Sequence, residues 1–439
     1  MNNTTLALSA GFDRSLAWYQ GGSVRYLVAR VQADREDPSA EGSVLPANLA
    51  LVIDASGSMS GAKLESAKRA ASGVIDSLGA NDVLSVISFA SDVLVHVDGA
   101  YMDERGRADA LSAVRRLETR GNTNLSDGWL TGSACVARRM IAGSGVAHRV
   151  VLMSDGQANE GVTAPTELAR HAAELQARGI TTSTVGIGDD YQAAVLQALA
   201  EEGGGQMHDA ELAEDIVAIL LGELRETKAV AVERATVTVD LPEGVEASLV
   251  GFYPSTQEPD RLVVRVGSLG TGRPRSVILK LKFPQGKIDD VVTLRVRASG
   301  RAAGTDSPVD ALAQDAAMTF AHGARNTPQL QDPQLSLAVA EAWYAQVVHA
   351  VAGMNRGGER RQSRHYLERE LRHFERYCRN LPGTELLTGE LVLLLRHVDS
   401  DWDERTRKVM QHRSFAMARV QADVPNARVA QTWAERLEP

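Results

Sequence analysis

The chain has 439 residues, a formal net charge of −9 and an apolar fraction of 44%. This length predicts two or three domains, and the composition is ordinary for a soluble globular protein. The acidic net charge gives no electrostatic reason to expect a nucleic-acid partner or adsorption to an anionic membrane.

Cysteine usage and the N-terminus favour a cytoplasmic location. Cys135 and Cys378 stand far apart and in no metal-ligand spacing, which is typical of a reducing compartment. Residues 1–16 lack the basic and apolar regions of a secretion signal, and Asp13 interrupts their short hydrophobic patch. No segment approaches the roughly 20 continuous apolar residues that span a bilayer. We therefore expect a cytoplasmic protein without a membrane span.

Residues 1–46 are expected to form a β-hairpin followed by a loop. Residues 23–33 are rich in β-branched and aromatic side chains, whereas residues 36–46 carry turn-forming residues. The hairpin has no sheet of its own to join. We predict that residues 4–33 pair with strands that come much later in the chain.

Residues 47–228 alternate between strand and helix patterns. Residues 49–53 and 149–153 are short apolar runs typical of strands buried on both faces, and residues 93–97 suit an antiparallel edge strand. Amphipathic helices are predicted between the strands at residues 63–78, 104–117, 125–141, 165–178, 191–202 and 212–224. This alternation predicts a mostly parallel central sheet covered by helices.

The period changes again after residue 229. Apolar side chains recur at every second position through residues 229–305, as in residues 277–283, where they alternate with lysines. This pattern is typical of the antiparallel sheets of a β-sandwich. Residues 308–323 are ambiguous between helix and strand, and apolar stripes at helical spacing follow them. The predicted fold class is therefore α/β: a Rossmann-like domain (47–228) inserted in an antiparallel β-sandwich (1–46 and 229–305), with a helical region (306–439).

Polar residues follow two of the predicted buried strands at their carboxyl ends. In an open α/β sheet, ligands bind beyond these ends, where the strand order reverses. The loops expected to meet there carry Asp54, Ser56, Ser58, Thr123 and Asp155. Carboxylates and hydroxyls are ligands for Mg²⁺, Mn²⁺ or Ca²⁺, and no Cys or His cluster suits zinc. Two carboxylates and three neutral hydroxyls leave such an ion incompletely neutralised, particularly if Asp155 acts through a water, and this favours an acidic residue of a partner as a further ligand.

The pattern Asp54-x-Ser56-x-Ser58, then Thr123, then Asp155 resembles the metal-ion-dependent adhesion site of von Willebrand factor A (VWA) domains. The segments LVIDASGSM, VLSVISFAS, GNTNLSDGW, VVLMSDGQANEG and TVGIG resemble the bacterial branch of that family related to inter-alpha-trypsin inhibitor heavy chains. This resemblance covers about residues 48–227. It implies a metal-dependent protein-binding module, and it suggests multiprotein assemblies that contain AAA-type ATPases.

Several other readings stay open. DxSxS alone is also a helix N-cap pattern, although Thr123 and Asp155 in the right order favour the metal site. Gly57, Gly121 and Gly156 are interpreted as backbone requirements, and Asn124 as a support of the Thr123 loop. His148 and His208 are interpreted as structural.

The predicted metal site leaves three candidate functions for the chain. The leading hypothesis is a binding module that captures a partner's Asp or Glu through the cation. The runner-up is a scaffold in which the metal only stabilises the fold and the helical tail binds partners. A metal-dependent hydrolase ranks third, because no general base stands beside the predicted ion and no P-loop, GxSxG or HExxH motif is present. The chain is therefore predicted not to be an enzyme. A separate hypothesis is that the helix at residues 212–224 shifts when the metal site binds an acidic ligand, as it does in related domains.

Overall fold

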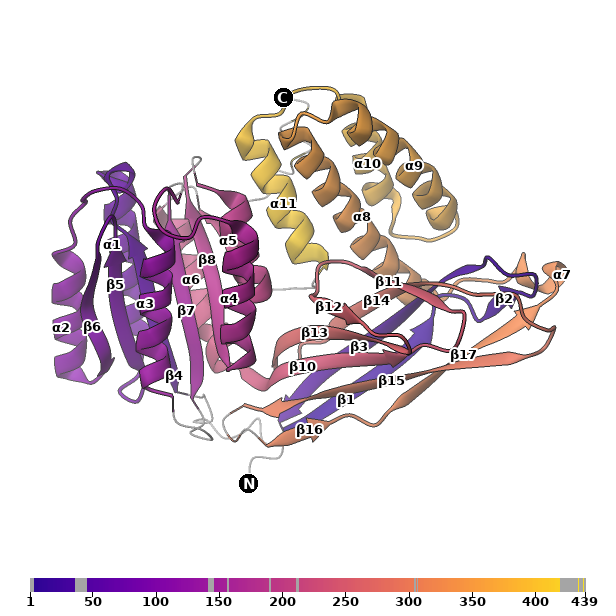
Figure 1. Cartoon of the computed structure of the whole chain (residues 1–439), viewed down its shortest axis with the longest axis horizontal. Helices are drawn as coiled ribbons and strands as arrows, with labels where there is room; N and C mark the ends of the chain where they lie inside the picture. Colours follow the sequence, from indigo (N-terminus) through magenta and orange to yellow (C-terminus); the bar gives the residue numbers. More distant parts are fainter. Residues whose placement is uncertain are drawn as a thin grey trace.

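The computed structural model folds into an α/β domain, a β-sandwich and a helical region (Figure 1). It describes residues 4–35, 46–140, 146–155, 158–188, 191–210, 213–303, 305, 307–418, 433 and 437. Strands from residues 4–35 pair with strands that follow residue 274. The α/β domain is therefore inserted within the sandwich, as the sequence predicts.

The central sheet of the α/β domain has six strands. Its spatial order is β6 (Val93–Tyr101), β5 (Val83–Phe89), β4 (Ala47–Asp54), β7 (Ala147–Ser154), β8 (Ile180–Ile187) and β9 (Gly204–Ala210). Every pairing is parallel except the one between β5 and the edge strand β6. The order runs outward from β4 in both directions, so the strand order reverses between β4 and β7.

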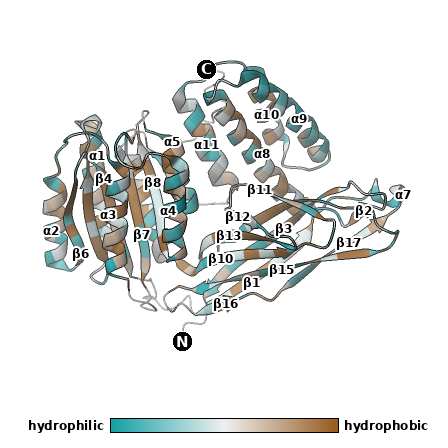
Figure 2. Cartoon of the chain, viewed as in Figure 1, coloured by the Kyte–Doolittle hydropathy of each residue, from teal (hydrophilic) through white to brown (hydrophobic). Residues whose placement is uncertain are grey.

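Helices cover both faces of this sheet. One face packs against α1 (Ala62–Ser77), α2 (Glu104–Arg115) and α6 (Ala213–Lys228). The other packs against α3 (Leu125–Arg138), α4 (Pro165–Ala177) and α5 (Ala193–Glu202). The inner strands are almost wholly apolar, as the brown central ribbons of Figure 2 show. A sheet buried on both faces holds the loops at its carboxyl edge in fixed positions.

The sandwich consists of two sheets. The inner sheet has the order β1 (Thr4–Phe12), β3 (Val24–Arg35), β14 (Arg275–Lys282), β11 (Glu246–Val250). The outer sheet has the order β12 (Ser255–Gln257), β13 (Arg261–Gly270), β10 (Val230–Asp240), β15 (Val291–Ala302), β17 (Gln314–Ala321), β2 (Leu16–Trp18), and β16 (Pro308–Asp310) pairs with β15. One apolar core joins the facing sides of both sheets.

The inner sheet is buried on its second face as well, which makes this half of the molecule three layers deep. Leu27 and Ala29 of β3 point into the sandwich core, whereas Tyr26 and Val28 point into a second core that the helices cover. This alternation follows from the period of two along a strand. The helices concerned are α8 (Pro333–Arg356), α9 (Arg360–Cys378), α10 (Glu385–His397) and α11 (Glu404–Ala418).

The predicted start of the helical region at residue 306 is wrong. Strands β16 and β17 continue the sandwich to Ala321, and the short helix α7 (Gly323–Asn326) follows. Met318 and Phe320 of β17 are buried in the sandwich core. Alanine-rich segments suit helix or strand, and pairing with β15 decides the outcome here.

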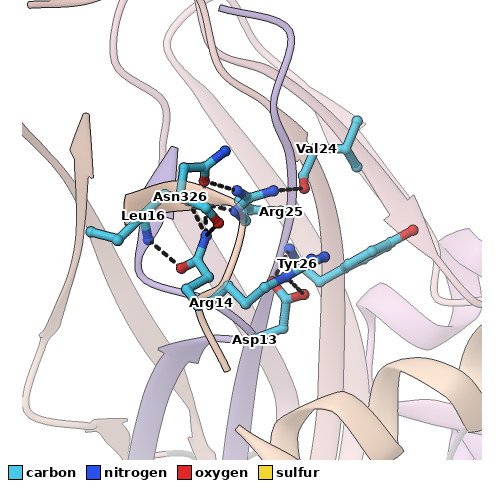
Figure 3. A network of polar contacts seen from close by, with 8 residues as sticks. Asp13, Arg14, Leu16, Val24, Arg25, Tyr26 and Asn326 are labelled. Carbon is cyan, nitrogen blue, oxygen red and sulfur yellow. Dashed lines mark hydrogen bonds and ion pairs between the residues drawn. The ribbon is translucent and has the colours of Figure 1, made fainter. Parts of the chain in front are cut away.

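A polar network ties the N-terminal strands to the residues after β17 (Figure 3). The Arg25 guanidinium donates to the Leu16 carbonyl at 2.7 Å and to Asn326 Oδ1 at 2.5 Å. Asp13, which is fully buried, accepts from the Tyr26 backbone N–H at 2.8 Å. Asp13 therefore joins the end of β1 to β3, and burial raises the pKa of its carboxyl.

The helical region also touches the α/β domain. In Figure 1, α11 is the helix of the helical region that lies nearest to the α/β domain. The ammonium of Lys408, 2% exposed, lies 3.5 Å from the centre of the Tyr191 ring, and the Tyr191 hydroxyl donates to Asp209 at 2.8 Å. Within the described residues, α8 is the one helix long and apolar enough to cross a membrane, and 56% of its apolar window is buried inside the fold.

Candidate metal centre

Asp54, the last residue of β4, anchors the candidate site. Its side chain is fully buried. One carboxylate oxygen accepts from the Ser56 backbone N–H at 2.9 Å, and the other accepts from the Ser154 hydroxyl at 2.6 Å. Burial raises the pKa of this carboxyl, although the hydrogen bonds from Ser154 and Ser56 oppose the effect. The carboxylate is thus fixed at the point where the strand order reverses.

Three more of the predicted residues join Asp54. The Ser56 and Ser58 hydroxyls lie 3.0 Å apart, and Ser58 donates to Asp155 Oδ1 at 2.8 Å. Asp155 follows β7 directly and is fully buried. The two carboxylates, one from the end of each neighbouring strand, are therefore linked through two serine hydroxyls.

Thr123 lies in the loop that precedes α3 and is 4% exposed. Its backbone N–H donates to Asn159 Oδ1 at 3.0 Å, and Gly57 N–H donates to the Gly121 carbonyl at 3.2 Å. These bonds hold the Thr123 loop against the Asp54 loop. In the described part of the chain the Thr123 hydroxyl makes no hydrogen bond to the other four residues. Backbone contacts therefore place the Thr123 loop beside these residues, and its hydroxyl does not contribute a bond to them.

The supporting residues have separate roles. Asn124 is the N-cap of α3: its Oδ1 accepts from the Asp127 N–H at 3.3 Å. Gly57 donates the backbone bond that joins the two loops. Gly121 has a φ of +51°, which side-chain-bearing residues rarely adopt. Gly156 lies outside the described residues.

Gly121→Ala is expected to destabilise the fold by about 1–2 kcal/mol, because φ is left-handed and an added Cβ would lie 2.8 Å from the Ser91 hydroxyl. Denaturant unfolding of the full chain measures the loss. Gly353→Ala in α8 is the matched control, since a Cβ there meets no atom within 4 Å. Equal stability of the Gly121 variant and the wild type would contradict this requirement.

The sequence reasoning missed Lys63. This residue lies in the first turn of α1, and its ammonium lies 2.5 Å from Asp155 Oδ2. A lysine is unfavourable at a helix N-terminus, where the helix dipole is positive. The ion pair with Asp155 offsets this unfavourable position. Lys63 is about one-third exposed, at 32%, and it neutralises part of the charge of Asp155.

The donor set fits a hard divalent cation. Carboxylate and hydroxyl oxygens are the ligands that Mg²⁺, Mn²⁺ and Ca²⁺ take. The described residues contain no group of three or more His, Cys, Asp or Glu side chains placed to hold a metal. His148 and His208 lie elsewhere, and contact Asn48 and Glu223. The residues that would hold the ion are thus Asp54, Ser56, Ser58 and Asp155, with Thr123 in the adjoining loop.

Comparison with known proteins identifies the α/β domain. Residues 48–219 match the family model of the von Willebrand factor type A domain. An uncharacterized protein of Synechocystis is 29% identical over 252 residues, which are 55% of this chain and 58% of that protein. Human inter-alpha-trypsin inhibitor heavy chain H3 is 29% identical over 171 residues, 37% of this chain and 19% of that protein. The chain thus spans less than two thirds of the length of these relatives.

Solved structures extend the likeness of fold to nearly the whole chain. A von Willebrand factor type A protein from Catenulispora acidiphila has a TM-score of 0.69 at 17% identity, over 93% of this chain and 90% of that one. The ArnB paralog VWA2 from Sulfolobus acidocaldarius has a TM-score of 0.60 at 18% identity, over 95% and 98%. At these identities the likeness concerns the fold alone, and it includes the sandwich and the helical region.

Proposed function

We propose that the von Willebrand factor type A domain of this chain, residues 48–219, binds a divalent cation and uses it to capture a carboxylate of a partner protein. Domains of this type commonly mediate protein–protein interaction and adhesion. The observation that carries the proposal is the linked group of Asp54, Ser56, Ser58 and Asp155 between the ends of β4 and β7. Mg²⁺ is the proposed ion, with Mn²⁺ or Ca²⁺ as substitutes.

The local charge supports an outside ligand. Lys63 already offsets part of the charge of Asp155, at 2.5 Å. A divalent cation held by Asp54, Asp155 and neutral hydroxyls would therefore keep a net positive charge. The bound ion would supply a Lewis-acidic position that accepts an anionic oxygen, and an Asp or Glu of a partner protein is the simplest donor.

A binding role is proposed in preference to catalysis. A metal-assisted hydrolase needs a general base within hydrogen-bond reach of the attacking water. The described side chains in contact with Asp155 are Ser58 and Lys63, and neither is a good base in its usual protonation state. We further propose a cytoplasmic setting and a multiprotein assembly, for which an AAA-type ATPase is one candidate partner.

The test of this function is retention of a partner from lysate of the source organism by the full chain. We expect a protein to bind in Mg²⁺, to be released by EDTA, and to be absent with Asp54→Ala or Thr123→Ala. Asp103→Asn is the control, because Asp103 caps α2 at the opposite edge of the sheet. Retention that survives EDTA and both variants would refute metal bridging. It would favour the second candidate, a scaffold whose helical tail binds the partner.

Lys63→Met is expected to raise the affinity for Mg²⁺ about fivefold, because it removes a competing cation from Asp155. A partly exposed ion pair contributes about 1 kcal/mol. A free-energy difference of this size changes a binding affinity about fivefold. Calorimetric titration of the metal-stripped chain measures the change. Lys68→Met is the control on the same helix, since Lys68 pairs with the exposed Glu65. Unchanged or weaker Mg²⁺ binding in the Lys63 variant would show that the lysine does not compete.

A further inference from the structure

The outer side of α9 carries a row of basic side chains. Residues 360–379 contain seven arginines and three glutamates, although the whole chain has a net charge of −9. Six basic residues stand three or four positions apart, so they share one side of the helix. All six are exposed, and they form the α9 basic strip: Arg361, His365, Arg369, Arg372, Arg376 and the C-cap Arg379. The strip is about 27 Å long at 1.5 Å per residue.

The opposite side of α9 is fully used by the fold. Leu367, Leu371 and Phe374 are buried in the core of the helical region. Figure 1 shows α9 on the side of that region away from the α/β domain, and Figure 2 shows α9 as mostly hydrophilic. The buried side therefore holds the helix in place, while the basic strip stays available to a partner outside the chain.

Most of the strip is not neutralised within the chain. Beside it, Arg360 and Arg364 pair with Asp401 and Asp399, which follow α10. Within the strip, Arg369 pairs with its neighbour in sequence, Glu370. The remaining four arginines make no ion pair or hydrogen bond through their side chains within the described residues: Arg361, Arg372, Arg376 and Arg379. Unmatched positive charge therefore runs along the exposed side of the helix.

The pattern of charge favours the carboxylates of a protein over a continuous polyanion. Guanidinium groups bind carboxylates through two parallel hydrogen bonds. Glu368 and Glu375 stand four residues before and three residues after Arg372, at the margin of the strip. A nucleic-acid backbone carries a charge at every phosphate and would meet both glutamates. A protein segment, in contrast, can place a neutral or basic residue opposite each of them.

Two further observations separate the possible partners. An amphipathic helix binds a bilayer by inserting its apolar side, and the apolar side of α9 is buried within the fold. The acidic remainder of the chain does not prevent an acidic partner from binding, because charges more than about 8 Å away are screened at physiological salt. The local charge of the strip therefore decides which partner docks there.

We propose that the α9 basic strip is a docking surface for an acidic segment of another protein. Carboxylates of that segment would pair with the four arginines that lack a partner within the described residues. The length of the strip corresponds to five turns of helix, at 5.4 Å per turn. This surface lies in the helical region, so the proposal is independent of the metal site.

The test is fluorescence anisotropy of a labelled peptide titrated with the full chain. The probe is a helical peptide of about 20 residues, long enough to follow the strip, with glutamate at every third or fourth position. EDTA is present throughout, so that no metal can hold the peptide. We expect the glutamate peptide to bind, the same peptide with glutamine not to bind, and added salt to weaken the binding.

Arg372→Gln combined with Arg376→Gln is expected to weaken peptide binding about tenfold, because two exposed ion pairs are lost. Arg105→Gln combined with Arg115→Gln is the matched control, since it removes the same charge from exposed positions of α2. We expect this control to bind as the wild type does. Thermal unfolding of both double variants checks that each is folded.

Parallel titrations with single-stranded DNA and with vesicles that contain phosphatidylserine test the other kinds of partner. The proposal is overturned if the glutamate peptide does not bind at millimolar concentration, or if both double variants weaken its binding equally. It is also overturned if DNA or vesicles bind the strip more tightly than the peptide does. Self-association of the wild type that the strip variant abolishes would assign the surface to a second copy of the chain instead.

Discussion

Glu223→Ala is expected to destabilise the VWA domain by about 3–5 kcal/mol, because it leaves a buried arginine without its counter-ion. Glu223 lies on α6 and is 3% exposed. Its carboxylate accepts from Arg149 of β7 and, at 2.7 Å, from Ser183 of β8, and it lies 2.6 Å from His208 Nε2 of β9. One side chain thus fastens α6 to three neighbouring strands.

The pH dependence of this interaction has a defined sign. Burial alone would raise the pKa of Glu223, but Arg149, His208 and Ser183 together lower it below its usual 4.5. A lowered folded-state pKa means that the stabilisation is present above pH 4.5 and is lost as the pH falls through the lowered value. The difference in stability between wild type and Glu223→Ala should therefore shrink in acid.

Denaturant unfolding followed by circular dichroism measures this prediction. Glu174→Ala on α4 is the control, because this glutamate is about half exposed, at 52%, and such surface changes usually stay within about 0.5 kcal/mol. Glu223→Gln preserves the shape and is expected to cost less than the alanine variant. A loss below about 1 kcal/mol for Glu223→Ala would mean that the network does not hold α6.

Asp54→Asn is the second change with a large expected effect. At a Mg²⁺ concentration one hundred times its dissociation constant, the wild type should gain about 2.7 kcal/mol of stability. The variant should gain none, because it lacks one of the two carboxylates. Unfolding curves with Mg²⁺ and with EDTA measure both quantities.

The same variant is expected to be more stable than the wild type without metal. Burial raises the pKa of Asp54, so its ionised form opposes folding at neutral pH, and this cost falls as the pH is lowered toward the raised value. Asparagine removes the charge and retains a hydrogen-bond acceptor. Asp103→Asn should leave the Mg²⁺ response intact. An equal Mg²⁺ response in the Asp54 variant would place the ion elsewhere.

The sequence predicted the parts of the fold that depend on the local spacing of apolar residues. The buried cores of β4 and β7 appear as apolar runs, and Asp54 ends β4 whereas Asp155 directly follows β7. Strand topology therefore brings these carboxylates together, and the motif order is enough to predict it. The insertion of the VWA domain followed from a hairpin that had no partner of its own.

The contacts that the sequence did not reveal are those made by polar residues across large separations. Glu223 stands beside the apolar stripe of α6 and looks like a solvent-facing residue, yet its partner Arg149 lies 74 positions earlier. The pairing of Lys63 with Asp155 spans 92 positions. Strand β17 was ambiguous for a different reason, since its small residues suit either structure until β15 pairs with it.

Calorimetric titration of Mg²⁺ and Mn²⁺ into the metal-stripped full chain is the most direct test of the proposed metal-dependent binding. We predict one site per chain in the wild type and in Asp103→Asn, and no site in Asp54→Asn. Absence of a site in the wild type, or a site that Asp54→Asn retains with the same affinity, would contradict the assignment of the metal centre to the ends of β4 and β7.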